Sequence, residues 1–329
     1  MKRSYNIVTA CDDDFAQHTT VMLASLFSHH QECSFQVFIL VPSDFLEETA
    51  SKIIASFNTN VRLKIIRVSD DAVRELKVDG HVTKAAYFRL RIDELLPAAL
   101  QRVLYLDPDI IVTGDVTELF ETDLLDFPFG AVPDLFIEVY RKDILSKIEL
   151  SEGAHYFNSG VLLIDLPRWR SLNIGGRAIT YCRSNRDAIT FWDQCALNHA
   201  ANGQFYVLDQ KWNFQAYSVF QTESSARLHS AKIVHFTGKL KPWHFLCTHP
   251  LKHLYFETLR TTAWTEFKVH WTHRDLIKRI LGPTMSRAAV AAARRIRIWP
   301  RPWSASSIGG SSAPDRLRLA HRWGWSRGE

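Results

Sequence analysis

The chain has 329 residues, of which 46% are hydrophobic and 23% are charged. This composition is typical of a globular protein and excludes global disorder, collagen and a coiled coil. The five cysteines are odd in number and show no C-x-x-C spacing. They argue against a disulfide framework or a structural zinc site, and they favour a reducing compartment.

The positive charge is concentrated at the C-terminal end. Residues 272–329 contain twelve Lys or Arg and three Asp or Glu, a net charge of +9, which leaves −4 for residues 1–271. We therefore expect a domain at 1–271 that carries the chemistry and a basic tail at 272–329 that attaches it to a surface. No signal peptide is visible, and no apolar run approaches the ~18 residues of a membrane-spanning helix. The expected location is the cytoplasm.

Strands alternate with helices along the chain. Apolar or alternating runs predict strands at 5–11, 35–41, 61–68, 103–106, 110–112, 160–165 and 232–236. Helical patterns are found at 18–31, at 43–57 with Ser43 as a plausible N-cap, and at 83–96. This alternation predicts a mostly parallel sheet, in which ligands bind at the carboxyl ends of the strands. Cys11 to Phe15 follow the first strand and are therefore a candidate site.

The sequence Asp107-Pro108-Asp109 interrupts an apolar run between the strands VLYL and IIV. Two residues apart on an extended chain, the two carboxylates point to the same side. Such a pair suits Mg²⁺ or Mn²⁺ bound together with a diphosphate, although solvated acids in a turn would give the same short motif. His235 ends a strand in the string HFTGKLKPW, which also offers a glycine and the lysines Lys239 and Lys241 for phosphate charge. An imidazole beside two carboxylates favours Mn²⁺ over Mg²⁺.

Six strings in order resemble the family 8 retaining glycosyltransferases from about residue 5 to residue 271. They are NIVTACDDDFA, HVTKAAYFRL, VLYLDPDIIV, FNSGVLLIDLPRW, FWDQCALN and HFTGKLKPW. The likeness extends to bacterial enzymes that build lipopolysaccharide or lipooligosaccharide with α-linked galactose or glucose. It implies a GT-A fold, a mixed and mostly parallel α/β sheet flanked by helices. It also implies a UDP-hexose donor and a lipid-linked saccharide acceptor.

The resemblance assigns roles to particular residues. It implies that a divalent cation, usually Mn²⁺ with Mg²⁺ possible, is held by Asp107, Asp109 and His235. It implies catalytic roles for Asp134, Asp193 and Gln194, with Asp193 and Gln194 near the anomeric carbon and Asp134 at the donor site. The implied donor-binding residues are Ala10, Asp12, Asp14, Phe15, Arg89, Asp107, Pro108, Asp109, Asn158, Gly238 and Lys241.

The chain departs from the family pattern at three positions. Asp14 stands where Asn is usual, Phe15 where Tyr is frequent, and Cys195 where a common D-Q-D motif has its second Asp. Phe15 can still stack on uracil, whereas Asp14 adds negative charge near the nucleotide. Cys11 and Cys195 are expected to be small buried residues without a redox role.

Two mechanisms are compatible with retention of configuration. We favour attack from the face that UDP leaves, with the leaving phosphate oxygen accepting the proton of the acceptor hydroxyl and Gln194 positioning the sugar. The rival is double displacement through a covalent intermediate. An amide is a poor nucleophile, so Asp193 would be the better choice there if it reaches the anomeric carbon.

The tail interleaves Arg and Trp, including Arg322, Trp323 and Trp325. A helical pattern at 274–281 adds an amphipathic segment. These features favour an anionic membrane surface on the inner face of the cytoplasmic membrane over nucleic acid or an extension without a role. A nucleic-acid partner is not expected.

Other functions share parts of this pattern. A sugar nucleotidyltransferase would need a Gly-rich basic loop after the first strand, where this chain has Asp12-Asp13-Asp14. A non-catalytic glycan-binding or partner-binding protein would not need the complete set of Asp107, Asp109 and His235. A self-glycosylating primer would need an acceptor tyrosine, and the sequence singles out none.

Overall fold

The computed structural model describes residues 3–57, 61–69, 71, 73–76, 78, 83–215, 229–273, 275–276 and 279–280. The strands are β1 (Ser4–Ala10), β2 (Ser34–Pro42), β3 (Val61–Val68), β4 (Arg102–Leu106), β5 (Ile110–Val112), β6 (Phe129–Pro133), β7 (Phe157–Asp165), β8 (Tyr206–Val207), β9 (Phe214–Gln215) and β10 (Ile233–His235). The α-helices are α1 (Asp13–Ser28), α2 (Glu47–Ala55), α3 (Ile92–Leu95), α4 (Thr117–Glu121), α5 (Leu135–Tyr140), α6 (Lys142–Lys147), α7 (Leu166–Ser171), α8 (Ile174–Ser184), α9 (Trp192–Ala201) and α11 (Lys252–Leu259).

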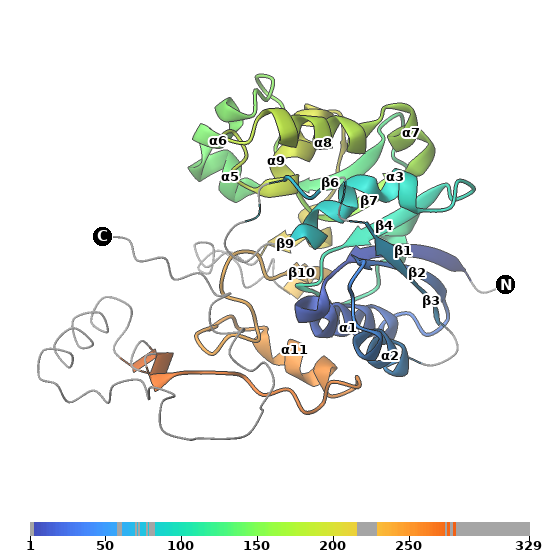
Figure 1. Ribbon diagram of the computed structural model, residues 1–329, viewed down its shortest axis with the longest axis vertical. Coiled ribbons are helices and arrows are strands. Elements are labelled where there is room, and N and C mark those ends of the chain that lie inside the picture. The colour runs from blue at the N-terminus through green and yellow to red at the C-terminus, as the bar shows by residue number, and fades with distance from the viewer. Residues whose placement is uncertain are drawn as a thin grey trace, which may run out of the picture.

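The strands form two sheets. The larger has seven strands in the order β3-β2-β1-β4-β7-β6-β8, and the smaller has the order β5-β10-β9. Strands β3, β2, β1 and β4 run parallel, whereas β7 is antiparallel to both β4 and β6. Helices α1 and α2 cover one face of the large sheet and α8 and α9 the other (Figure 1). The predicted mixed, mostly parallel α/β fold is confirmed.

Alternation along the strands separates two apolar cores. Val8 of β1 and Phe38 of β2 pack in one core with Leu197 of α9. Their neighbours Ile7 and Val37 lie in the other core with helix α1. Because successive strand residues point to opposite faces, a run that is apolar throughout is buried by helices on both sides. The carboxyl ends of β1 and β4 are therefore buried between two packed layers.

Helix boundaries differ from the sequence prediction. Helix α1 begins at Asp13 rather than at 18, because the Asp12 side chain caps it by accepting the N–H of Phe15 at 3.0 Å. The helix predicted at 43–57 is restricted to Glu47–Ala55, and its N-cap position is Leu46 instead of Ser43. The helix predicted at 83–96 is a 3₁₀ helix over Lys84–Arg91 followed by the short α3.

The turn at Pro108 joins the two sheets. Strand β4 ends in the large sheet and β5 begins in the small sheet, where it pairs antiparallel with β10. The N–H of Asp107 donates to the carbonyl of Gly160 in β7 at 2.9 Å, and the N–H of Phe236 donates to the carbonyl of Asp109 at 3.0 Å. These bonds connect Asp107 to the large sheet and Asp109 to the end of the small sheet.

Most of the tail predicted at 272–329, including half of the helix at 274–281, lies outside the described residues. The division at residue 272 remains a prediction. Among the helices that the structure does describe, none has the length and apolarity needed to cross a membrane.

Candidate active site

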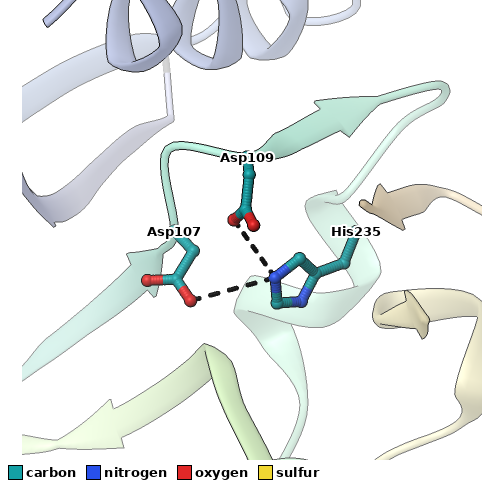
Figure 2. Close-up of side chains that lie close together, drawn as sticks. All are labelled: Asp107, Asp109 and His235. Atoms are coloured by element: carbon teal, nitrogen blue, oxygen red, sulfur yellow. Dashed lines mark ion pairs between the residues drawn. The ribbon is translucent and has the colours of Figure 1, made fainter. Parts of the chain in front are cut away.

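Two carboxylates and an imidazole meet where the two sheets join. One ligand atom from each of Asp107, Asp109 and His235 lies within 4.8 Å of the others. Nε2 of His235 is 3.1 Å from Oδ1 of Asp109 and 3.9 Å from Oδ2 of Asp107 (Figure 2). His235 comes from the end of β10 and pairs in register with Ile110 of β5. The β5–β10 pairing therefore carries His235 to the aspartates.

This cluster has the composition of a divalent-cation site. Carboxylate oxygens suit Mg²⁺ and Mn²⁺, and an imidazole nitrogen adds a ligand that borderline metals accept. Gly160 leaves room beside it, since a methyl group at that position would lie 2.3 Å from Cε1 of His235 and 2.8 Å from Oδ2 of Asp107. The donor atoms and the space between them fit a bound cation.

Lys241 adds a cation on the other side of Asp109. Its Nζ forms an ion pair with Oδ2 of Asp109 and donates to the carbonyl of Phe236 at 2.7 Å. Burial by itself would raise the pKa of the Asp109 carboxyl, but Lys241 and His235 lower it below its ordinary value. Asp109 is therefore ionised at neutral pH, as a metal ligand must be.

Arg89 connects the cation cluster to the opposite wall. Its Nη2 lies 2.7 Å from Oδ1 of Asp107, and its Nε lies 3.0 Å from Oδ2 of Asp193. The guanidinium is stacked on the ring of Tyr105, whose hydroxyl also donates to Asp107 at 2.9 Å. Burial lowers the pKa of Arg89, but the two carboxylates raise it by more than burial lowers it. The guanidinium therefore stays charged. Arg89 thus holds Asp107 and Asp193 in fixed positions.

Asp193 is buried and already engaged. Its Oδ2 accepts the Ser159 hydroxyl at 3.3 Å in addition to the contact with Arg89. Burial raises the pKa of Asp193 to about 6, and the guanidinium of Arg89 only partly offsets this effect. A carboxylate held by a guanidinium is a weakened nucleophile.

The amides of Gln194 and Asn158 converge on Asp134. Nε2 of Gln194 donates to Oδ2 of Asp134 at 3.2 Å, and Nδ2 of Asn158 donates to the same oxygen at 3.3 Å. Oε1 of Gln194 accepts the backbone N–H of Ser159 at 3.1 Å. Asp134 is fully buried and also caps α5 by accepting the N–H of Ile137. The amide of Gln194 is thus oriented from both ends.

A pocket of about 540 Å³ brings these groups together, a size that suits a small-molecule ligand. The predicted residues that line it are Ala10, Asp12, Phe15, Arg89, Asp107, Pro108, Asp109, Asp134, Asn158, Asp193, Gln194, His235, Gly238 and Lys241. Asp14 is exposed and does not belong to this lining, so its predicted donor contact has no support from the geometry.

Other lining residues were not assigned from the sequence. They are Thr83, Ala85, Ala86, Phe136, Ile137, Ser159 and Phe191. Trp192 has a φ of 38°, an unfavourable conformation for a large side chain, directly before Asp193 and Gln194. Asn213, Gly160 and Tyr105, which contact the cluster from outside, were also missed because no local pattern marks them.

An aromatic group supports the end of the pocket at Phe15. Phe15 meets Trp243 edge-on, and Trp243 is stacked on His18 at 3.5 Å between ring centroids. Burial lowers the pKa of His18 to about 3, so this imidazole is neutral, and its Nδ1 lies 2.6 Å from the hydroxyl of Tyr255. The packed rings hold Phe15 at the pocket wall.

Cys11 and Cys195 are buried, as predicted. Burial raises the pKa of the Cys11 thiol to about 12 and raises that of Cys195. Sγ of Cys195 accepts the N–H of Phe191 at 3.2 Å. A protonated, packed thiol is a structural residue rather than a reactive one.

Comparison with known proteins identifies relatives of this arrangement. The family model described as glycosyl transferase family 8 matches residues 6–247. General stress protein A of Bacillus subtilis is 29% identical over 79% of this chain and 94% of its own length. The lipopolysaccharide 1,2-glucosyltransferase of Escherichia coli is 24% identical, and the lipopolysaccharide 1,3-galactosyltransferase of Salmonella typhimurium is 26% identical, each with 79% of both chains covered.

A solved structure shares the fold. The crystal structure of the galactosyltransferase LgtC, in complex with donor and acceptor sugar analogues, superimposes with a TM-score of 0.69 at 27% identity. The match covers 80% of this chain and 97% of that one. The sheet order and flanking helices described above are therefore those of the GT-A fold.

Proposed function

Since the chain belongs to glycosyl transferase family 8, we propose that it is a metal-dependent retaining hexosyltransferase. Its donor is UDP-galactose or UDP-glucose. Its product carries an α-linked hexose on a lipid-linked saccharide, such as the core of lipopolysaccharide. The observation that carries this proposal is the cluster of Asp107, Asp109 and His235, which lines the same pocket as Lys241 and Gly238.

Different lining residues would contact the nucleotide and the hexose of the donor, at two ends of the pocket. Phe15 offers an aromatic ring on which uracil can stack, and Ala10 and Asp12 line the same pocket. Gly238 has a φ of 82° with open space around its Cα, so the backbone can approach a diphosphate there. Asn158, Asp134 and Gln194 offer fixed polar atoms for the hexose at the other end.

The chemistry requires stabilisation of a leaving UDP. A divalent cation, Mn²⁺ or Mg²⁺, bound by Asp107, Asp109 and His235 would supply charge to the diphosphate as the glycosidic bond breaks. Lys241 places a second positive charge beside the same phosphates, in a buried position where electrostatic interactions are strong. Arg89 keeps Asp107 in place while this charge develops.

The contacts favour attack from the face that UDP leaves. Asp193 is engaged by Arg89 and Ser159 and is 5% exposed, which opposes its use as a nucleophile. Gln194 is held by Ser159 and Asp134, which suits it to positioning the sugar rather than attacking it. The proton of the acceptor hydroxyl then passes to the departing phosphate oxygen.

The proposed acceptor follows from the relatives. Proteins of Escherichia coli and Salmonella typhimurium with 24% and 26% identity are named as lipopolysaccharide glycosyltransferases. A lipid-linked acceptor is met at a membrane surface, and the net charge of +9 over 272–329 suits anionic lipid at the inner face of the cytoplasmic membrane. Deleting 272–329 is expected to abolish cosedimentation with anionic vesicles, whereas unchanged cosedimentation would remove the tail from the proposal.

The activity is tested by UDP release from a panel of UDP-sugars with Mn²⁺, with Mg²⁺ and with EDTA. We expect slow metal-dependent hydrolysis of one UDP-hexose, and its loss in Asp109→Asn. Asp126→Asn, which replaces a fully exposed carboxylate, serves as the control and is expected to behave like the wild type. Hydrolysis of no UDP-hexose, together with no metal-dependent binding of UDP, would refute the proposal.

A further inference from the structure

The side-chain amide of Asn158 can have only one orientation. The backbone N–H of Gly160 lies 3.0 Å from one end of that amide, and a backbone N–H can only donate. The atom facing Gly160 is therefore the oxygen, Oδ1. The nitrogen, Nδ2, then faces Oδ2 of Asp134 at 3.3 Å, and this is the acceptor it requires.

The same logic extends to the next amide. A side-chain atom of Asn213 lies 2.9 Å from Oδ1 of Asn158. Because Oδ1 can only accept, the Asn213 atom facing it must be the nitrogen, Nδ2. The oxygen of Asn213 then faces Nδ1 of His235 at 3.1 Å, and an amide oxygen can only accept. Nδ1 of His235 must therefore carry a hydrogen.

We infer that Asn213 is a positioning residue that sets the tautomer of His235, through a relay of amides whose direction is imposed by the backbone N–H of Gly160. With the hydrogen held on Nδ1, Nε2 is the nitrogen that can give a lone pair to a cation bound by the two carboxylates. Nε2 is the atom 3.1 Å from Asp109 and 3.9 Å from Asp107. This inference rests on the proposed function in one respect, that the cluster binds a divalent cation.

Burial makes the relay effective. Asn213 is 1% exposed, Asn158 is 5% and His235 is 4%, so water cannot replace a lost acceptor. Without the oxygen of Asn213, nothing keeps the hydrogen of the imidazole on Nδ1, and Nε2 can carry it and donate it to Asp109. That tautomer has no lone pair directed at the carboxylates. Partners of this kind typically change metal affinity by about 10–100-fold.

The relay also connects the two walls of the pocket. Asp134 accepts from Asn158 and from Gln194 through the same oxygen, Oδ2. The orientation of Gln194 is set independently by the N–H of Ser159. The residues proposed to hold the hexose and the nitrogen proposed to hold the metal thus belong to one hydrogen-bond network.

The first test measures Mn²⁺ affinity by electron paramagnetic resonance, without donor or acceptor. Asn213→Leu removes the acceptor and is expected to weaken Mn²⁺ binding about 10–100-fold. Asn213→Asp keeps an oxygen for Nδ1–H but places its second oxygen against Oδ1 of Asn158, so it is expected to weaken Mn²⁺ binding less than Asn213→Leu does. Asn198→Leu is the matched control, because Asn198 is also 1% exposed but bonds to the backbone of Phe157 and Gln194 instead. It is expected to leave Mn²⁺ affinity unchanged.

The second test observes the tautomer directly by NMR of the Mg²⁺-loaded protein labelled with ¹⁵N-histidine. The signals of His235 are identified from their loss in His235→Gln. We expect Nδ1 to show the shift of a protonated nitrogen, and an unprotonated Nδ1 would overturn the inference. Wild-type Mn²⁺ affinity in Asn213→Leu would also overturn it while leaving transferase activity, and so the proposed function, intact. Conversely, a protonated Nδ1 with weakened Mn²⁺ binding in a protein that transfers no hexose would refute the function and support the relay.

Discussion

Replacing Gly160 with alanine is expected to destroy the cation site while leaving the fold intact. The added methyl group would lie 2.3 Å from Cε1 of His235, 2.7 Å from Nδ1 of the same ring and 2.8 Å from Oδ2 of Asp107. Unstrained carbon contacts are about 3.5 Å or longer, so the imidazole would have to retreat by about 1 Å. Oδ1 of Asn213 lies 3.1 Å from Nδ1 of that ring, and this hydrogen bond restricts the directions in which the ring can move.

A displacement of this size exceeds what a metal site tolerates. Ligand distances vary by only about 0.2 Å between good sites, so a shift of about 1 Å removes His235 as a ligand. We expect Mn²⁺ affinity to fall at least about 100-fold. Overpacking in a buried strand also costs about 1–3 kcal/mol of unfolding free energy, which a protein of ordinary stability survives.

The assay is titration with Mn²⁺ followed by electron paramagnetic resonance, beside urea denaturation followed by circular dichroism. Gly130→Ala in the neighbouring strand β6 is the control. Its methyl group would lie 2.9 Å from Cδ2 of Leu124, far from the cluster and against the end of a flexible side chain. It should lower stability comparably without changing Mn²⁺ affinity. A folded Gly160→Ala variant that binds Mn²⁺ as tightly as the wild type would refute the reasoning.

Three further predictions concern the charges around the pocket. Lys241→Ala should weaken UDP binding in Mn²⁺ by about tenfold or more in calorimetry, since a charge-assisted contact contributes about 1.5–3 kcal/mol; undiminished affinity would contradict this. Arg89→Leu leaves the carboxylates of Asp107 and Asp193 without their cation. It should lower the unfolding free energy by about 3–5 kcal/mol in urea, and a loss below about 1 kcal/mol would contradict the assigned network. The pKa of His18 is lowered from 6.5 to about 3, so below pH 6.5 the unfolded chain binds a proton that the folded protein refuses. Its contribution to stability is complete above pH 6.5 and is lost as the pH falls, by up to about 1.4 kcal/mol per pH unit. His18→Gln should flatten this dependence in urea titrations between pH 6.5 and 4, and parallel curves for the two proteins would disprove it.

Local patterns in the sequence predicted the class of fold and the strands other than β6, β8 and β9. The strand predicted at 61–68 coincides with β3, and those at 5–11 and 35–41 agree with β1 and β2 within a residue. A run of apolar or alternating residues can be recognised within a few positions of the sequence. Such a run predicts a strand because a strand buries these side chains between two helical layers. Helix starts were less predictable. The capping of α1 by Asp12 and the 3₁₀ geometry of Lys84–Arg91 depend on hydrogen bonds that residue spacing does not specify.

The proposed metal-ligand set could be identified from the sequence because only Pro108 separates Asp107 from Asp109 and His235 lies in a family-like string. The residues that position these ligands, or leave space for them, could not be identified from the sequence. Asn213 belongs to no string, Gly160 looks like an ordinary strand glycine, and the pairing of Arg89 with both Asp107 and Asp193 joins separate segments. These contacts exist only because β4 leaves the large sheet at Pro108 and β5 pairs with β10 in the small one. The sequence alone therefore determined which chemical groups this protein has. Long-range strand pairing decided which of them meet, because a hydrogen bond or an ion pair depends on distance in space rather than along the chain.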